Sequence, residues 1–445
     1  MTTPICDFVK NYTEKNYMRL HMPGHKGAGF LGVEKYDITE IDGADSLYEP
    51  TGIIMESEKN ASEIFGSDTF YSAEGSSQCI KTMVYLAGLY AQKKGRKRLI
   101  YAARNGHRSF VSAVSLCDFE VKWLCSDNDD TYLSCRITKE YLDNELKNAE
   151  ELPVAVYITS PDYLGSIQDI KSLSEVCKKY DVLFLCDNAH GAYLKFLPES
   201  MHPIDLGADM CCDSAHKTLP ALTGAAYLHL GKSVSEILSY CVRNAMALFG
   251  STSPNYLILQ SLDYLNKYLD EVYRKKLNEF IITAKTLKDR LEDCGYDIYG
   301  DEVLKLTLKP KSRGYTGREI AAMLLKKGVV CEFYDEEFVV LMLTPEIDKN
   351  DTERIFETLC SIEKRESLLS KKYKRINHIQ KMSIRDAVMS ESEEVSLKNA
   401  CGRVLSQLTV SCPPAVIVVS PGEEITMEDT EILKSTGAEK LWVIK

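Results

Sequence analysis

The sequence lacks three features that would indicate a membrane, a metal or a nucleic acid. No apolar run is long enough to span a bilayer, and no pair of cysteines has the CxxC spacing of a zinc site. The net charge of −11 disfavours binding to nucleic acid and to anionic membrane surfaces. We therefore predict no membrane partner, no nucleic-acid partner and no bound metal.

The 15 cysteines are scattered along a chain of 445 residues that begins without a signal peptide. This pattern predicts reduced, mostly buried thiols in a cytoplasmic protein. With 44% apolar and 27% charged residues, the composition is ordinary for a soluble globular protein. The length allows two or three domains and a large core. No internal repeat or low-complexity segment is present.

One lysine, Lys217, follows a strand expected at 182–187 and precedes an apolar run at 223–229. Burying it as a cation is costly, but a neutral amine there can attack a carbonyl carbon. Asp187 ends its strand at the carboxyl edge of the expected sheet, where α/β folds bind ligands. This acid and this amine fit pyridoxal 5'-phosphate (PLP), with Lys217 as the Schiff base and Asp187 facing the pyridinium nitrogen. Taken alone, Lys217 could equally lie in a surface turn.

A candidate phosphate site follows the strand expected at 69–73. The stretch Glu74–Gln78 breaks this strand and opens a helix expected at 78–94. The positive end of the helix and the hydroxyl groups of Ser76 and Ser77 can together bind an anion. An ordinary serine N-cap would explain the same residues, so this signal is weak by itself.

Alternating strands and helices between residues 69 and 230 predict an α/β fold with a doubly wound, buried, mostly parallel sheet. His107 follows a strand expected at 98–102 and falls at the same edge of the sheet as Ser76 and Asp187. An imidazole there can stack on a cofactor ring, although a lone loop histidine is more often a surface residue.

A smaller α+β domain is expected after the last long helix. Capping boxes are predicted in this domain at Thr316–Glu319 and Asn350–Glu353. A third is predicted at Ser172–Glu175, in the larger domain before it. Further along, we expect an exposed basic link at Ser370–Arg375, a break at Cys412–Pro414 and a strand at 415–419.

Eight short motifs follow one another along the chain: His21–Lys26, Asp37–Glu40, Glu74–Ser77, Arg104–His107, Asp187–Ala192, Ser214–Lys217, Ser251–Pro254 and Pro421–Glu423. With these motifs in this order, the chain resembles the Orn/Lys/Arg decarboxylase family of fold-type-I PLP enzymes, in a short form without the N-terminal wing domain. The resemblance implies a PLP-dependent transferase-like fold: a mostly parallel central sheet with helices on both faces, and a small α+β C-terminal domain.

The resemblance also implies the parts of the chain and their roles. We expect an N-terminal segment that contributes to the active site (1–50), a large PLP-binding domain (51–295), a small α+β domain (296–372) and a decarboxylase-type C-terminal region (373–445). Lys217 would form the Schiff base, Asp187 would pair with the pyridinium nitrogen and His107 would stack on the ring. The remaining residues expected at the cofactor are Ser76, Ser77, His190, Ser214 and His216, with Ser251 or Thr252 reaching the phosphate of a partner subunit.

The implied reaction is the decarboxylation of lysine, arginine or ornithine to a primary amine and CO2, a step of polyamine-related metabolism. Lys217 or His216 would return a proton to Cα, and a homodimer or a higher homo-oligomer is expected. Acids in the entrance, such as Glu40, Asp45 or Glu423, would attract the distal cation of the substrate.

Three residues, and the tail stretch Cys412–Val416, differ from the pattern of the family. Glu74 stands where members usually have Asn, and a carboxylate beside a phosphate would oppose binding unless it turned away. Asn188 and Tyr193 are also substituted. One alternative is an aminotransferase or a β/γ-lyase of the same fold, which the Ser214–Lys217 and His21–Lys26 motifs disfavour. Another is a catalytically silent paralogue, for which Glu74 and Tyr193 are the support.

Overall fold

The computed structural model describes residues 1–125, 131–370, 373, 376, 378–408 and 413–445. The chain forms two compact units. The first unit comprises Met1–Lys93 and Leu183–Leu277, and the second comprises Lys94–Val182 and Asn278–Lys445. Most of the predicted basic link and Cys412 of the predicted break lie outside the described residues.

The first unit contributes four strands to a seven-stranded sheet, in the order β1 (Asp68–Ser72), β7 (Ala226–Leu230), β6 (Met210–Asp213) and β5 (Leu183–Asp187). β5 and β6 run parallel, whereas β7 is antiparallel to both of its neighbours. β5 and β7 are buried at every position. Burial on both faces explains why these segments are almost continuously apolar in the sequence.

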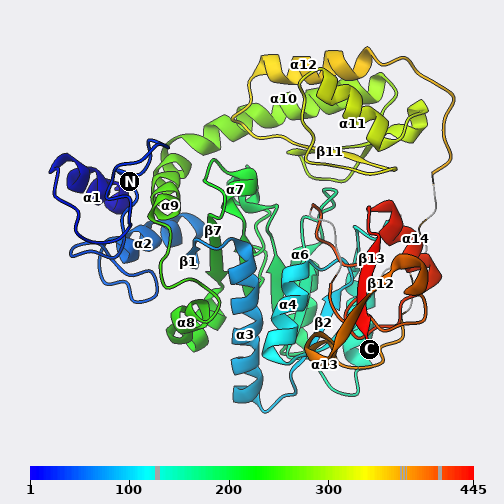
Figure 1. The fold of residues 1–445 in the computed structure, drawn as a ribbon, viewed down its shortest axis with the longest axis horizontal. Helices are drawn as coiled ribbons and strands as arrows, with labels where there is room; N and C mark the ends of the chain where they lie inside the picture. The colour runs from blue at the N-terminus through cyan, green and yellow to red at the C-terminus, as the bar shows by residue number, and fades with distance from the viewer. Residues whose placement is uncertain (126–130, 371–372, 374–375, 377, 409–412) are drawn as a thin grey trace. The chain divides into compact units, whose positions relative to one another are not determined.

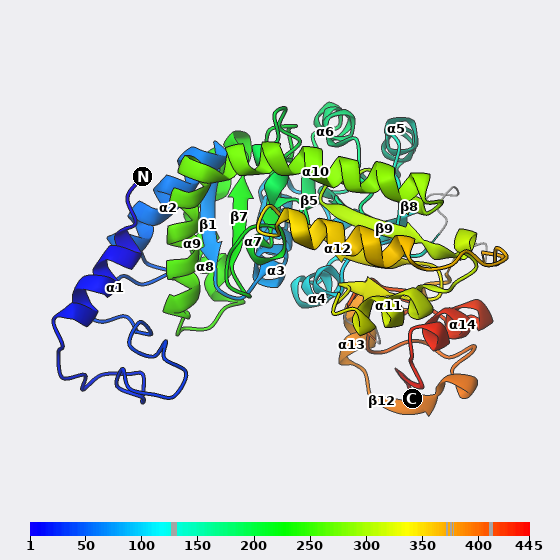
Figure 2. The same ribbon diagram turned by 90° about the horizontal axis from the view of Figure 1, so that it is seen from above.

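Six helices of the first unit are α1 (Pro4–Glu14), α2 (Ile53–Phe65), α3 (Ser76–Lys94), α7 (Ala215–Thr218), α8 (Lys232–Ala247) and α9 (Tyr256–Tyr268), and a 3-10 helix covers Ala192–Phe196. Figures 1 and 2 show α1, α2 and α9 side by side at the β1 end of this unit. The N–H of Cys6 on α1 donates to Asp263 Oδ2 on α9 at 2.9 Å. This contact helps to fix the N-terminal helix to the body of the unit.

The second unit contributes the other three strands in the order β4 (Ala155–Thr159), β2 (Leu99–Ala103) and β3 (Glu120–Leu124), and all three are parallel. They alternate in sequence with α4 (Arg108–Cys117), α5 (Lys139–Lys147) and α6 (Ile170–Lys179). The predicted α/β class with a mostly parallel sheet is therefore confirmed.

A four-stranded antiparallel sheet in the second unit has the order β10 (Phe333–Tyr334), β11 (Val339–Met342), β9 (Lys305–Lys309) and β8 (Asp297–Tyr299). The helices α10 (Arg274–Asp293), α11 (Gly317–Lys326) and α12 (Lys349–Cys360) cover one face of it, as Figures 1 and 2 show. A π-helical turn at Leu269–Tyr273 links α9 to α10, and a 3-10 turn covers Pro310–Arg313. This is the small α+β arrangement that the sequence predicts.

Only one of the three predicted capping boxes lies where it was expected. Thr316 and Glu319 form the box that starts α11. The box of α12 lies two residues upstream of its predicted position, at Asp348 and Asp351, and α6 is capped by Asp169. Asp is as good an N-cap as Ser or Thr, so an acid upstream can begin the helix earlier than the predicted motif.

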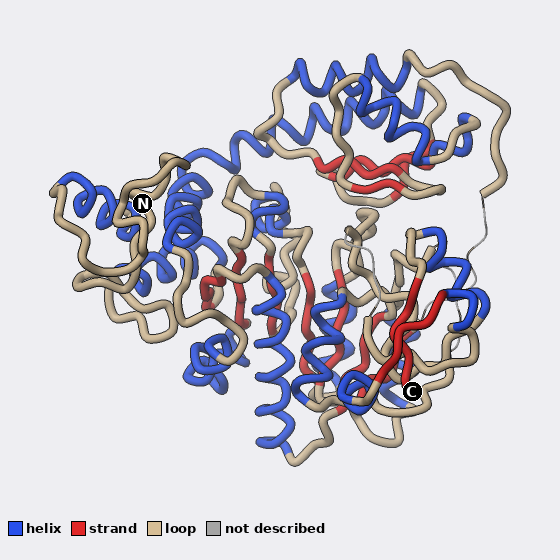
Figure 3. Tube along the Cα trace, in the orientation of Figure 1, coloured by secondary structure: helices blue, strands red, loops and turns tan. Residues whose placement is uncertain are grey.

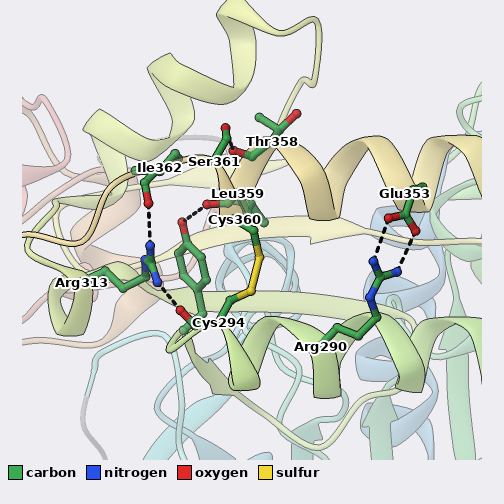
Figure 4. Close-up of a disulfide and its surroundings, with 10 residues drawn as sticks. Arg290, Cys294, Arg313, Glu353, Thr358, Leu359, Cys360, Ser361 and Ile362 are labelled. Atoms are coloured by element: carbon green, nitrogen blue, oxygen red, sulfur yellow. Dashed lines mark hydrogen bonds and ion pairs between the residues drawn. A yellow bond between two sulfur atoms is a disulfide. The ribbon is translucent and has the colours of Figure 1, made fainter.

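A disulfide joins Cys294 and Cys360, which are 66 positions apart in the sequence (Figure 4). Cys294 follows α10 and Cys360 ends α12, so the bond ties the ends of two helices together. Beside it, the Tyr296 hydroxyl donates to the Leu359 carbonyl at 2.9 Å. The prediction that the cysteines are reduced is therefore wrong for this pair. The sequence does not reveal the bond, because no local spacing marks two cysteines at the ends of different helices.

The C-terminal residues form α13 (Ile384–Met389), β12 (Ser392–Ser396), a 3-10 turn (Leu397–Asn399), α14 (Met427–Ser435) and β13 (Lys440–Ile444). β12 and β13 pair in an antiparallel two-stranded sheet, drawn in red near the C-terminus in Figure 3. The strand predicted at 415–419 is wrong, since there only Val416 pairs, in an isolated bridge to His107. Val418 and Val419 are apolar because they pack in a core cluster with Leu441. In the described part of the chain, no helix is long and apolar enough to cross a membrane.

Candidate active site

Lys217 lies in the short helix α7, directly after β6. Its side chain is partly buried, and Nζ lies 3.2 Å from Nε2 of His190. His190 is buried and belongs to the loop that follows β5. The first unit therefore brings together an amine and an imidazole between which a proton can pass.

Two serine hydroxyls meet at the N-terminus of α3. Ser214 Oγ donates to Ser76 Oγ at 2.7 Å, although one serine follows β6 and the other begins α3. Ser77 is the next residue of the first helical turn. Gly75 has a φ of +70°, and a Cβ built on it would meet nothing within 4 Å. The space beside Gly75 is therefore open, next to the N–H groups that begin this 19-residue helix. Together with the hydroxyls of Ser76 and Ser214, these N–H groups can bind an anion.

Asp187 ends β5 and is 2% exposed. Its Oδ1 accepts hydrogen bonds from the N–H of Ala189 at 3.2 Å and from Sγ of Cys212 at 3.7 Å. Burial raises the pKa of Cys212 well above its ordinary value, so the thiol stays protonated and can donate. Sequence reasoning did not assign a role to Cys212. Its position on β6 opposite Asp187 is visible only from the register of the two strands.

His216 is positioned by the backbone. Its Nδ1 lies 3.0 Å from the carbonyl oxygen of Ala225, to which it donates. Burial, and to a smaller degree the nearby Lys217, lowers the pKa of His216. A neutral ring with its Nδ1 proton engaged offers Nε2 as an acceptor, so the geometry does not favour His216 as the proton donor to Cα.

His107 belongs to the second unit and caps α4, where its Nδ1 accepts from the N–H of Ser109 at 3.1 Å. It follows β2, as the sequence predicts. Its stacking on a cofactor ring stays a prediction.

Ser251 and Thr252 are exposed in the loop before α9. The N–H of Ser251 donates to Oε1 of Glu74 at 3.4 Å. The carboxylate of Glu74 is thus directed to this loop.

Two of the three acids expected to attract the substrate have other partners. Asp45 is buried and accepts N–H groups of Thr51 and Gly52 at 2.9 and 2.8 Å, in front of α2. Glu423 is 2% exposed and accepts two hydrogen bonds of 2.6 Å from Arg104. Their predicted role at the entrance is therefore wrong, because both carboxylates are engaged inside the fold. Glu40 is exposed, and its role stays a prediction.

Comparisons with known proteins identify the family of the chain. The family model "Orn/Lys/Arg decarboxylase, major domain" matches residues 3–306, and "Orn/Lys/Arg decarboxylase, C-terminal domain" matches residues 366–437. An arginine decarboxylase of Bacillus subtilis is 29% identical, over 96% of this chain and 92% of its own. An arginine decarboxylase of Bacillus anthracis is 26% identical, over 97% and 92%. The structure of lysine decarboxylase A from Pseudomonas aeruginosa superimposes with a TM-score of 0.80 at 16% identity, over 99% of this chain and 80% of that one.

Proposed function

We propose that this protein, which belongs to the Orn/Lys/Arg decarboxylase family, decarboxylates arginine. Members of this family depend on PLP and decarboxylate a basic amino acid. The expected fold type I and the expected reaction class are thereby confirmed. Support for arginine comes from the two Bacillus relatives, which are arginine decarboxylases and align over nearly the whole chain.

The observation that carries the proposal is the cluster of groups in the first unit. Ser76 and Ser214 meet at the N-terminus of α3, in front of the open space at Gly75. The buried Asp187 ends β5, and Lys217 follows the adjacent parallel strand β6. These groups fit the phosphate, the aldehyde and the ring nitrogen of PLP, so we assign Ser76, Ser77 and Ser214 to the phosphate, Lys217 to the aldehyde and Asp187 to the nitrogen.

When bound, PLP supplies an electron sink that accepts the electron pair of the breaking carbon–carboxylate bond. The carboxylate of Asp187 favours the protonated ring nitrogen, which makes that sink effective. The amine of Lys217 would hold the cofactor, and the same amine, once free, would be placed to return a proton to Cα of the substrate. His190 lies 3.2 Å from Lys217 Nζ and can accept and give back the proton of this amine.

A homodimer belongs to the same proposal. The loop of Ser251 and Thr252 is exposed in the single chain, where two hydroxyl groups are available to a partner subunit. Sedimentation of the PLP-loaded protein tests this, and a monomer at micromolar concentration would contradict it. The cytoplasmic location stays a prediction.

The test of function is incubation with PLP and arginine, lysine or ornithine, with CO2 and the amine product measured. We expect kcat/KM for arginine to exceed that for the other two by at least about tenfold, because a site that pairs with a guanidinium distinguishes it from an ammonium. Lys217→Ala should be inactive, and Lys171→Ala, an exposed lysine of α6, should match the unaltered protein. A keto-acid product would indicate an aminotransferase, and PLP binding without turnover would indicate a silent paralogue.

A further inference from the structure

A second cluster of polar side chains lies on one face of the sheet in the first unit. The proposed reaction does not use these side chains. It consists of Cys211 and Asp213 on β6, His229 on β7 and His202 from the loop before β6. All four side chains are fully buried. Cys211 and Asp213 alternate along β6 and so share one face, and Cys211 pairs directly with His229.

The donor atoms of this cluster converge on one small volume. Nε2 of His202 and Nε2 of His229 lie 3.1 and 3.3 Å from the same oxygen, Oδ2 of Asp213. Sγ of Cys211 lies 3.9 Å from Nε2 of His202. One ligand atom from each of the four residues lies within 4.8 Å of every other.

These separations match the edges of a tetrahedral zinc site. With Zn–N and Zn–O near ~2.0 Å and Zn–S near ~2.3 Å, neighbouring ligand atoms stand about 3.3–3.6 Å apart. The 3.1, 3.3 and 3.9 Å separations already lie close to those values. The pairs that are farthest apart, at up to 4.8 Å, would close by about 1.5 Å at most.

We propose that Cys211, Asp213, His202 and His229 bind a zinc ion. One carboxylate and one thiolate balance the two charges of the metal, so the loaded site is neutral and tolerates complete burial. Four protein ligands leave no position for water or substrate, which makes this a structural site.

Two of the ligands, His229 and Asp213, have neighbours of the kind that orient the ligands of a structural metal site. Nδ1 of His229 lies 2.9 Å from Oγ1 of Thr69, which fixes the orientation of the ring. The other oxygen of Asp213 accepts from Nδ2 of Asn188 at 2.6 Å. Asn188 follows Asp187, and Ser214 follows Asp213. The zinc ion would therefore tie β6 to β7 and to the loop before β6, and the hydrogen bond of Asn188 to Asp213 would connect the site to the end of β5.

The competing arrangement is a metal-free network in which both imidazoles donate to Asp213. Metal analysis of the PLP-loaded protein, produced with zinc in the medium and washed with a chelator, separates the two. We expect about one zinc per chain in the unaltered protein. The Cys211→Ser and His229→Gln variants should keep less than about a tenth of it. Cys177→Ser, which removes a buried thiol of α6, should retain it fully.

Cobalt substitution keeps the proposal testable if these variants fail to fold. The unaltered protein, produced with cobalt instead of zinc, should show a thiolate-to-cobalt charge-transfer band and the intense visible bands of tetrahedral cobalt. Less than about 0.1 metal per chain together with the absence of these bands would overturn the proposal. Neither readout depends on decarboxylation, so failure of the proposed function would leave this test intact.

Discussion

The hydroxyl oxygens of Ser76 and Ser214 lie 2.7 Å apart, although the two residues are 138 positions apart in the sequence. One begins α3 and the other follows β6, so the pair exists only when the sheet of the first unit is formed. The phosphate site is thus a product of topology, because each hydroxyl alone is compatible with an ordinary cap or turn.

Removing either hydroxyl should weaken PLP binding. Ser76→Ala and Ser214→Ala should each raise the dissociation constant of PLP about tenfold or more, because a hydrogen bond to a charged group contributes about 1.5–3 kcal/mol. Titration of the PLP-free protein, followed by absorbance, measures this. Ser112→Ala is the control, since that hydroxyl bonds only to the backbone of its own helix, at Arg108. Equal affinity in all variants would remove these serines from the site.

The pH dependence of stability should include a contribution from Asp263. Burial raises its pKa to about 6 from an ordinary 3.8, against the hydrogen bonds donated by Ser57 and Cys6. Between those two pH values the folded chain keeps a proton that the unfolded chain loses. The free energy of unfolding should therefore fall as pH rises through this window, by up to about 3 kcal/mol.

Chemical denaturation across this pH range compares the unaltered protein with Asp263→Asn. The variant should lose this part of the pH dependence, since the amide does not ionise. Asp289→Asn, at an exposed position of α10, should retain it. The idea fails if the Asp263 variant and the unaltered protein lose stability in parallel as the pH rises.

The disulfide between Cys294 and Cys360 should stabilise the second unit. It closes a loop of 66 positions, and bonds of this kind typically contribute about 2–4 kcal/mol. Cys294→Ser, or reduction of the unaltered protein, should lower the free energy of unfolding by about this amount, and the denaturation midpoint should fall with it. Cys401→Ser, at an exposed free thiol, should not change it. An unchanged midpoint after complete reduction would show that the bond does not form.

The sequence was informative wherever a local pattern decides the structure. The apolar run before Asp187 predicts β5, and the glycine and serines after β1 predict the start of α3, to within one or two residues. The sequence correctly places Asp187 at the end of a strand and Lys217 shortly after another, and their roles at the cofactor stay predictions. The alternation of strands and helices likewise predicts the mostly parallel sheet.

Contacts between distant residues could not be predicted in this way. Glu423 was assigned to the substrate because nothing in the sequence shows that Arg104, 319 positions away, engages it. His202 and His229 are unremarkable in the sequence. Only the register of β6 and β7 and the loop before β6 bring them to one oxygen of Asp213.

The most direct test of the account is to locate bound PLP on the chain. The protein is loaded with PLP, reduced with borohydride to fix the carbon–nitrogen bond, digested and analysed by mass spectrometry. We predict a phosphopyridoxyl group on Lys217 in nearly every chain, and none at that position after addition of saturating arginine before reduction. A label on other lysines, or none at all, would contradict the assignment of Lys217 as the residue that holds the cofactor.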